Sequence, residues 1–579
     1  MTSGPKLAGL RRARGAALAA LFVAIPVLSI HAQSQKSATF DEPINLFHGL
    51  QMLATRDVSV PMDYAPLPRL AAAASARLFG PAVRHAPERT PWVPGILPQL
   101  AQRVLYLEND ADRLLFWGRL AFLPLHLGLA LAVFLVSRRL WGFGGGIASL
   151  FLLALSPSIL AHAPLVTADF PVTAFGFLAF AAAWASTHGR ALPWLLASGL
   201  ALGLALLSKP SAAFAVPVLL ACFAVRGAVT RRAAAAAGAP LLVFAVAVAV
   251  VWGAYSFRYA AWRTDDPALA EKQAVLAEFR ERSAPESAAA RGALAIAEEL
   301  RLLPEPYLLT LRFTLQQMQR RLSFFAGERS IEGSPLYFPA AFLLKTPLAL
   351  QLLLAGSVLA LLRRRIRLDP VAAAFLLLFP ALYFAAAIAA SINLGHRHIL
   401  PIYPFLFVLA GGAAAAARTR AERALLLALV AWFGASSLRV YPHSLTYFNA
   451  LAGGPRGGIR YLGDSNLDWG QDLAGVGPWM QRHGVARIKL AYFGTALPEY
   501  YGFAFDWLPS VGFANDREGP VEVKPGDHLA VSATCLQGFY FQDMAKYRFL
   551  DAYVPIDVIG NSIYIFHIVP ERRRGSGEK

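Results

Sequence analysis

Eleven long apolar runs recur along the chain, separated by polar segments. Each run is close to the ~20 residues that a helix needs to cross the hydrocarbon core of a bilayer. The runs predict membrane-spanning helices at about 15–32, 113–137, 142–163, 168–187, 192–208, 210–226, 233–255, 337–361, 371–392, 398–417 and 422–439. The pattern therefore predicts a polytopic α-helical membrane protein with about 11 transmembrane helices.

Three longer polar segments interrupt this pattern, at 33–112, 256–336 and 440–579. The first two alternate amphipathic stretches with Pro-rich turns, which is typical of helices and loops at a membrane interface. The third contains short β-like runs among helical and turn segments: RIKLAYFG, HLAVSATC and SIYIFHIV. We therefore predict a transmembrane module over 1–439 and a small α/β domain over 440–579.

Composition agrees, since 56% of the 579 residues are hydrophobic and only 16% are charged. The net charge of +18 would suggest nucleic acid if the basic residues formed one surface. They lie instead in clusters between alternate apolar runs, so we expect no nucleic-acid partner. Seventeen basic residues share one side of the predicted membrane: Lys6, Arg11, Arg12, Arg14, Arg138, Arg139, Arg190, Arg226, Arg231, Arg232, Arg363, Arg364, Arg365, Arg367, Arg418, Arg420 and Arg423.

The short loops on the opposite side carry only Lys209 and Arg397. By the positive-inside rule the N-terminus is cytoplasmic, and the C-terminal domain and the three long segments are extracytoplasmic. We expect a bacterial cytoplasmic (inner) membrane. A cleaved signal peptide is the alternative for the first run, but Ile30 at the −3 position of a cut after Ala32 fits such a site poorly.

Two acidic sites stand at the predicted outer face. Asp41 and Glu42 follow the first run, and Asp169 opens the fourth. Each aspartate suits the start of a helix that has a proline in its first turn, so helix capping is one interpretation. The other is catalytic: carboxylates near membrane depth are costly and tend to be functional. If so, Asp41 and Asp169 must share one cavity, and a separation above ~15 Å would exclude that role.

Basic residues occur at the same depth and offer a site for an anionic headgroup. Single cations near helix ends usually snorkel to the lipid headgroups, which is the alternative here. Lys345 is less suited to that, because it lies about 12 Å into its run at the rise of an α-helix. The candidates for binding a phosphate are Arg119, Lys209, Lys345 and Arg397.

The stretch GDSNLDWGQDL contains aspartates at every fourth position, Asp464, Asp468 and Asp472. It is not an EF-hand, because Trp469 and Gly475 replace the required Gly and Glu. A solvated acidic face is one interpretation; sugar or acceptor binding is the other. His396 and His398 flank Arg397 and would supply only two of the three or four protein ligands of a typical metal site, and a divalent cation is an alternative cofactor. The candidates for acceptor or sugar binding are Asp63, His396, Asp464, Asn466, Asp468 and Trp469.

Taken together, these stretches resemble the GT-C glycosyltransferases, and most closely the protein O-mannosyltransferase-like enzymes of glycosyltransferase family 39. Bacterial aminoarabinose transferases are more distant relatives. The resemblance runs from residue 39 to about 472 and rests on TFDEP, DYAPLPRL, SPSILAHAPLVTADFP, SFFAGERS, YFPAAFLLKTPLAL, RHILPIYPF, YFNALAGG and GDSNLDWGQDL.

The resemblance implies an enzyme that takes a sugar, with mannose as the candidate, from a polyprenyl-phosphate carrier to a protein, glycan or lipid acceptor at the outer face. Asp41 matches the family's catalytic Asp, Glu42 its neighbour, and Asp169 the second acidic site. The chain departs from the family where an HPPL-like stretch reads Tyr64-Ala65-Pro66-Leu67, and segment 256–336 is too short for the β-trefoil of the eukaryotic branch. The competing hypotheses are a non-enzymatic transporter or flippase of lipid-linked sugars and an assembly subunit.

Overall fold

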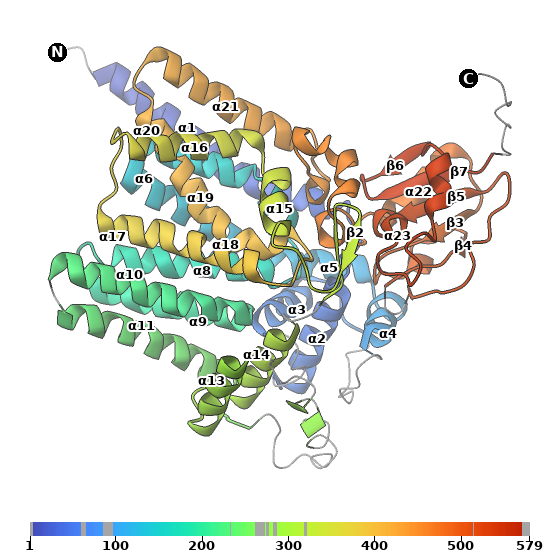
Figure 1. The fold of residues 1–579 in the computed structure, drawn as a ribbon, viewed down its shortest axis with the longest axis horizontal. Coiled ribbons are helices and arrows are strands. Elements are labelled where there is room, and N and C mark those ends of the chain that lie inside the picture. Colours follow the sequence, from blue (N-terminus) through green and yellow to red (C-terminus); the bar gives the residue numbers. More distant parts are fainter. Residues whose placement is uncertain are drawn as a thin grey trace.

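The structure, a computed structural model, describes residues 4–58, 65–84, 97–231, 233–260, 273, 277–278, 280–281, 287–317, 321–512 and 515–569. A bundle of long helices forms one part of the molecule and a small sheet domain lies at one end of it (Figure 1). Residues of the first outer segment and an irregular stretch after α21 (Arg420–Leu438) lie between the two parts. Asp63, a predicted acceptor-binding residue, falls outside the described residues.

The predicted polytopic helical class is confirmed. Within the described ranges, eight helices are long and apolar enough to cross a membrane, and a bent pair makes a ninth. The remaining difference from eleven has two causes. The runs at 113–137 and 142–163 belong to one candidate span, Ala111–Ala154, interrupted at Gly142, where φ is 76° and the helix cannot continue regularly. The run at 168–187 forms α8, a shorter helix of 17 residues.

The bundle has the following elements: α1 (Gly4–Gln33), α5 (Ala111–Leu120), α6 (Leu123–Ala154), α7 (Pro157–His162), α8 (Asp169–Ala185), α9 (Ala191–Ser208), α10 (Ala215–Thr230), α11 (Ala233–Ala254), α15 (Tyr337–Lys345), α16 (Leu348–Leu362), α17 (Pro370–Ala373), α18 (Phe379–Ala389), η4 (His396–Ile402), α19 (Tyr403–Ala410), α20 (Gly412–Ala416) and α21 (Arg420–Leu438). Helices α8, α9, α10 and α11 pack side by side. This arrangement brings the starts of α8 and η4 to the same end of the bundle as the end of α9.

The bend between α15 and α16 has a local cause. Pro347 disfavours the helical conformation at the residue before it, and Thr346 is extended (φ −87°, ψ 131°). The two helices therefore meet at 105°. The amide of Asn449 donates to the carbonyls of Leu343 (2.6 Å) and Thr346 (2.9 Å), which the break leaves without helical partners. The bend ends α15 at Lys345, so this lysine points out of the helix terminus rather than into a continuous span.

The outer segments form short helices, as predicted: α2 (Glu42–Thr55), α3 (Leu67–Phe79), α4 (Leu97–Gln102), α13 (Ala288–Glu299) and α14 (Glu305–Gln317). A small hairpin, β1 (Ser323–Phe325) with β2 (Glu328–Ser330), precedes α15. The apolar stripe of α2 is covered by protein, since Phe47 and Leu50 are buried. Helix α2 packs mainly on α3, and α3 packs on α5, which fixes the start of α2 against the bundle.

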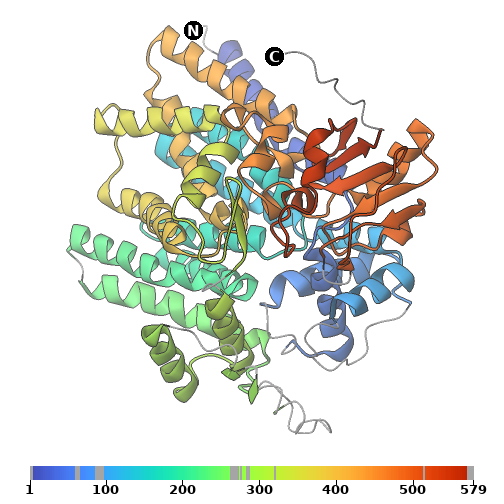
Figure 2. The same cartoon turned by 45° about the vertical axis from the view of Figure 1, so that its right-hand side comes forward.

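The C-terminal part, drawn in red and orange in Figure 2, forms a separate sheet region beside the helices. Its sheet is mixed and has five strands in the order β4-β3-β5-β7-β6. Its strands are β3 (Ile488–Ala491), β4 (Phe505–Trp507), β5 (His528–Ser532), β6 (Asp557–Ile559) and β7 (Ile563–His567). Strand β3 is parallel to β4 and β5, whereas β7 is antiparallel to β5 and β6. Helices α22 (Val476–His483) and α23 (Ala533–Gln537) complete it. The three predicted β-like runs correspond to β3, β5 and β7, so the predicted α/β class is confirmed.

Candidate active site

Two carboxylates from separate outer loops meet on one cation. Nη1 of Arg397 donates to Oδ2 of Asp41 at 3.0 Å and to Oδ2 of Asp169 at 3.2 Å. Because both oxygens contact the same nitrogen, the two carboxylates are close neighbours, far inside the ~15 Å limit for a shared site. Asp41 starts α2, Asp169 starts α8 and Arg397 lies in η4, so three distant segments converge here.

Neither aspartate caps its helix. Asp41 occupies the N-cap position of α2 but has helical φ/ψ and makes no capping hydrogen bond. Asp169 is the first residue of α8, after an Ala168 cap. Asp169 instead holds a second cation, because Nζ of Lys209 lies 2.6 Å from its Oδ1. The capping interpretation is therefore wrong for the side chains of both residues.

The two aspartates differ in access. The side chain of Asp41 is 31% exposed, whereas that of Asp169 is 3% exposed. A base must reach its proton within about one hydrogen bond, so access to an incoming substrate matters. Asp41 has that access, and Asp169 is enclosed by Lys209 and Arg397. Arg397 also lies over the ring of Trp469, 4.2 Å from its centroid, which fixes the guanidinium from a further side.

Glu42 and Arg119 form a separate, fully buried pair behind this cluster. Nη2 and Nε of Arg119 donate to the two carboxylate oxygens at 2.6 and 2.9 Å. The remaining guanidinium donors bind the carbonyls of Gln33, Lys36 and Ser37. Burial alone would raise the pKa of Glu42, but the charge of Arg119 and the hydrogen bonds hold it below its usual value. The pair ties α2 to α5 and to the end of α1, and its roles in catalysis and phosphate binding stay predictions.

Lys345 is also held by protein atoms. Its ammonium donates to the carbonyl of Leu445 at 2.9 Å and to the carbonyl of Asn466, and it lies 4.5 Å from the centroid of the Phe448 ring. Lys345 thereby fixes the irregular stretch after α21 against the end of α15. A contact with the carrier phosphate would require some of these bonds to open, so that role stays a prediction too.

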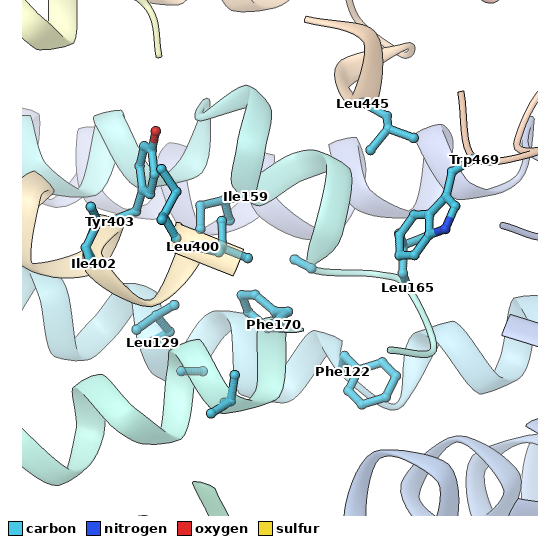
Figure 3. Close-up of a cluster of buried hydrophobic side chains, with 14 of the residues drawn as sticks. Phe122, Leu129, Ile159, Leu165, Phe170, Leu400, Ile402, Tyr403, Leu445 and Trp469 are labelled. Carbon is cyan, nitrogen blue, oxygen red and sulfur yellow. The ribbon is translucent and has the colours of Figure 1, made fainter. Parts of the chain in front are cut away.

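The stretch GDSNLDWGQDL lies under the site rather than in solvent. Asp464, Asp468 and Asp472 are all buried, and the stretch contains one short helical turn, η8 (Asp464–Asn466), and ends at the first residue of another, η9 (Leu473–Gly475). The solvated-face interpretation is therefore wrong. Asn466 organises the site indirectly, since its side chain accepts from the backbone N–H of His396 at 2.8 Å and donates to the Tyr337 hydroxyl at 2.8 Å. Trp469 lies beside Leu165 and Leu445 in the apolar cluster next to the site (Figure 3).

The three aspartates of this stretch have different surroundings. Burial raises the pKa of Asp468 to about 7, against hydrogen bonds from the backbone of Thr534 and Gly470. Asp472 is buried as well, but Lys36 and His443 lower its pKa to about 2. Burial raises the pKa of Asp464, which accepts from the Tyr540 hydroxyl. Their predicted role in sugar binding stays a prediction.

Metal binding has little support in the described ranges, where no group of three or more His, Cys, Asp or Glu residues is placed to hold a metal ion. His396 contacts the hydroxyl of Tyr403 at 2.6 Å. Sequence reasoning missed His162, at the end of α7. Its ring stands edge-on to Trp469, with 6.2 Å between centroids, and its buried Nδ1 has no hydrogen-bond partner in the described part of the chain. The signal was the histidine inside SPSILAHAPLVTADFP, a stretch already singled out for Asp169.

Residues 115–255 match the family model described as dolichyl-phosphate-mannose-protein mannosyltransferase. This segment is therefore similar to glycosyltransferases of that family. The predicted resemblance is thereby confirmed over about a quarter of the chain, from within α5 to the end of α11, which includes Arg119, Asp169 and Lys209. No curated protein sequence matches the chain significantly.

Two of the solved structures whose chains are similar to this one are those of ArnT and an oligosaccharyltransferase. The crystal structure of ArnT from Cupriavidus metallidurans bound to undecaprenyl phosphate has a TM-score of 0.48 and 14% identity, covering 95% of this chain and 97% of that chain. The Archaeoglobus fulgidus oligosaccharyltransferase tethered with an acceptor peptide has a TM-score of 0.40 and 14% identity, covering 74% of this chain and 57% of that chain.

Proposed function

We propose that the protein is an integral membrane glycosyltransferase that moves a sugar from a polyprenyl-phosphate carrier to an acceptor hydroxyl. The observation that carries the proposal is the convergence of Asp41, Asp169 and Arg397 at one end of the helix bundle. The family description, which names dolichyl-phosphate-mannose, supports a polyprenyl-phosphate donor and makes mannose the first sugar to test. The acceptor is a protein, glycan or lipid.

Asp41 is the proposed base. Its carboxylate takes the proton of the acceptor hydroxyl while the new C–O bond forms, in a single displacement that inverts the anomeric centre. The anomeric carbon gains oxocarbenium character, by analogy with glycoside hydrolysis. The exposure of Asp41 supports this role, and the enclosure of Asp169 supports a different one: holding Lys209 and Arg397 in position.

Arg397 is the proposed phosphate ligand, with Lys209 beside it. In the structure Arg397 is shared by two carboxylates. A carrier phosphate is an anion that competes for the same guanidinium, and charge-assisted bonds of this type are strong. Its arrival therefore releases Asp41 from Arg397 at the moment when a base is needed, and the cations stabilise the departing phosphate.

The proposal includes an orientation of the chain in the membrane, which rests on the distribution of basic residues. We place the N-terminus in the cytoplasm and the site, with the 440–579 domain, on the outer side of a bacterial inner membrane. The proposal also includes the division of the chain into a transmembrane module, 1–439, and an extracytoplasmic domain, 440–579.

The test is product analysis. Purified protein is incubated with polyprenyl-phosphate sugars and an envelope extract, and products are identified by mass spectrometry. A mass increase of one hexose on an acceptor, lost with Asp41→Asn, supports the proposal. Movement of intact lipid-linked sugar across liposomes without any glycosylated product would instead support the transporter.

A further inference from the structure

A cavity whose lining does not include Asp41, Asp169 or Arg397 lies on the side of α21. It has a volume of about 650 Å³ and lies between the first residue of α16 and the last turns of α21. Residues 447–456 of the irregular stretch and Asn561, in the turn between β6 and β7, close it. The volume falls within the roughly 300–1,000 Å³ of small-molecule sites.

The walls of this cavity are of two kinds. Leu348 and Trp432, on predicted spans, and Val440, directly after the last span, provide apolar lining, and the Trp432 side chain is exposed. Arg439 and Arg456 provide a cationic side, with Asn561 beside them. No Asp or Glu is among the lining residues. The cavity therefore combines two cationic side chains with an apolar lining.

The two arginines are unlike the other cations at this end of the bundle. Arg119, Lys209 and Arg397 each contact a carboxylate. Arg439 and Arg456 make no ion pair within the described ranges, although both face one cavity from different segments. The position of Arg439 can be explained without a ligand, because a cation is favourable at the C-terminal end of helix α21 and can also snorkel to the lipid headgroups. These reasons do not apply to Arg456, which lies in a separate turn, Pro455–Arg460.

We propose that this cavity binds an anionic glycerophospholipid, with its phosphate between Arg439 and Arg456 and an acyl chain along Trp432 and Leu348. Paired arginines match phosphate geometry, and the apolar wall excludes a purely soluble anion as the best ligand. A lipid bound here joins α21 to the β6–β7 turn and so fastens the C-terminal domain to the bundle. Phe448 lines the same cavity and contacts Lys345, which places the lipid one side chain away from the end of α15.

The experiment measures phosphatidylglycerol binding to delipidated full-length protein in detergent by native mass spectrometry. Arg439→Gln with Arg456→Gln should weaken binding by about tenfold or more, since two charge-assisted contacts are lost. The matched control is Arg423→Gln, an exposed arginine at the other end of α21, which should leave the affinity unchanged. Trp432→Ala should weaken phosphatidylglycerol binding but not the binding of glycerol 3-phosphate.

The outcomes separate the sources of phosphate. Wild-type affinity in the double arginine variant, with a native elution profile, would overturn the site. Glycerol 3-phosphate that binds as tightly as phosphatidylglycerol, with the same dependence on the arginines, would overturn the lipid and leave a soluble phosphate ligand. Phosphatidylcholine that binds equally tightly would overturn the requirement for an anionic headgroup. A melting temperature that rises with phosphatidylglycerol only in wild type and control supports the proposal.

Discussion

Glu42→Gln tests the Glu42–Arg119 ion pair, the most buried one among the residues that the structure describes. Both carboxylate oxygens of Glu42 already accept two or more hydrogen bonds: one from Arg119 and Val166, the other from Arg119 and Thr39. A glutamine must present its NH₂ group to one of these donor pairs, whichever way it turns. It also leaves the Arg119 charge buried without a counter-ion. Removing one partner of a buried pair costs about 3–5 kcal/mol.

The assay is thermal unfolding of purified protein in detergent, followed by intrinsic tryptophan fluorescence. Glu108→Gln is the matched control, because the Glu108–Arg103 pair has a similar distance of 2.7 Å but a largely exposed arginine, and such pairs contribute about 0–1 kcal/mol. We expect a clear loss of stability for Glu42→Gln and almost none for Glu108→Gln. Equal melting temperatures in the two variants would refute the structural role of the Glu42–Arg119 pair.

Three further predictions follow from the site and the fold. Arg397→Ala should weaken binding of the lipid donor by about 1.5–3 kcal/mol, which steady-state kinetics would show as a higher apparent KM. Unchanged KM and kcat would mean that Arg397 serves only in packing. Asp468→Asn should flatten the pH dependence of stability: the folded protein holds a proton on Asp468 up to about pH 7, whereas the unfolded chain loses it near 3.8. Wild-type stability should therefore fall as pH rises between these values, by up to about 4 kcal/mol, and a variant that still shows the full fall would contradict this. Reporter fusions after Arg321 and Glu578 should both be active outside the cytoplasm, and a cytoplasmic signal at either point would reverse the orientation.

The sequence identified the spans because length and apolar content are the requirements for crossing a bilayer. It singled out Asp41 and Asp169 as site candidates because carboxylates are scarce at that depth, and Arg397 because so few cations lie on that side; their roles stay predictions. The resemblance to the family then suggested a catalytic role for the two aspartates. The sequence could not supply the distances between Asp41, Asp169 and Arg397, because the three residues come from α2, α8 and η4 and meet only when these elements pack together.

The errors have specific causes. The length test counts fewer spans than the eleven predicted runs, because the two runs on either side of Gly142 fall in one helical segment and α8 has only 17 residues. The solvated interpretation of Asp464, Asp468 and Asp472 assumed a surface helix, whereas Lys345 and the sheet domain cover this stretch. The partnership of Glu42 with Arg119 spans 77 positions and leaves no periodic signal. The bend after Lys345 was readable, because a proline follows Thr346 directly.

The central claim is that Asp41 is the base of an outward-facing sugar transfer, and Asp41→Asn tests it most directly. Asparagine keeps the shape of the side chain, and Asp41 makes no capping bond, so the variant should fold and bind the lipid donor. It cannot accept a proton at neutral pH, so turnover measured by product mass spectrometry should fall by ~10²–10⁴. Asp506→Asn, on the exposed surface of β4, is the control that should transfer normally. Near-native turnover of Asp41→Asn in detergent or liposomes would contradict the account.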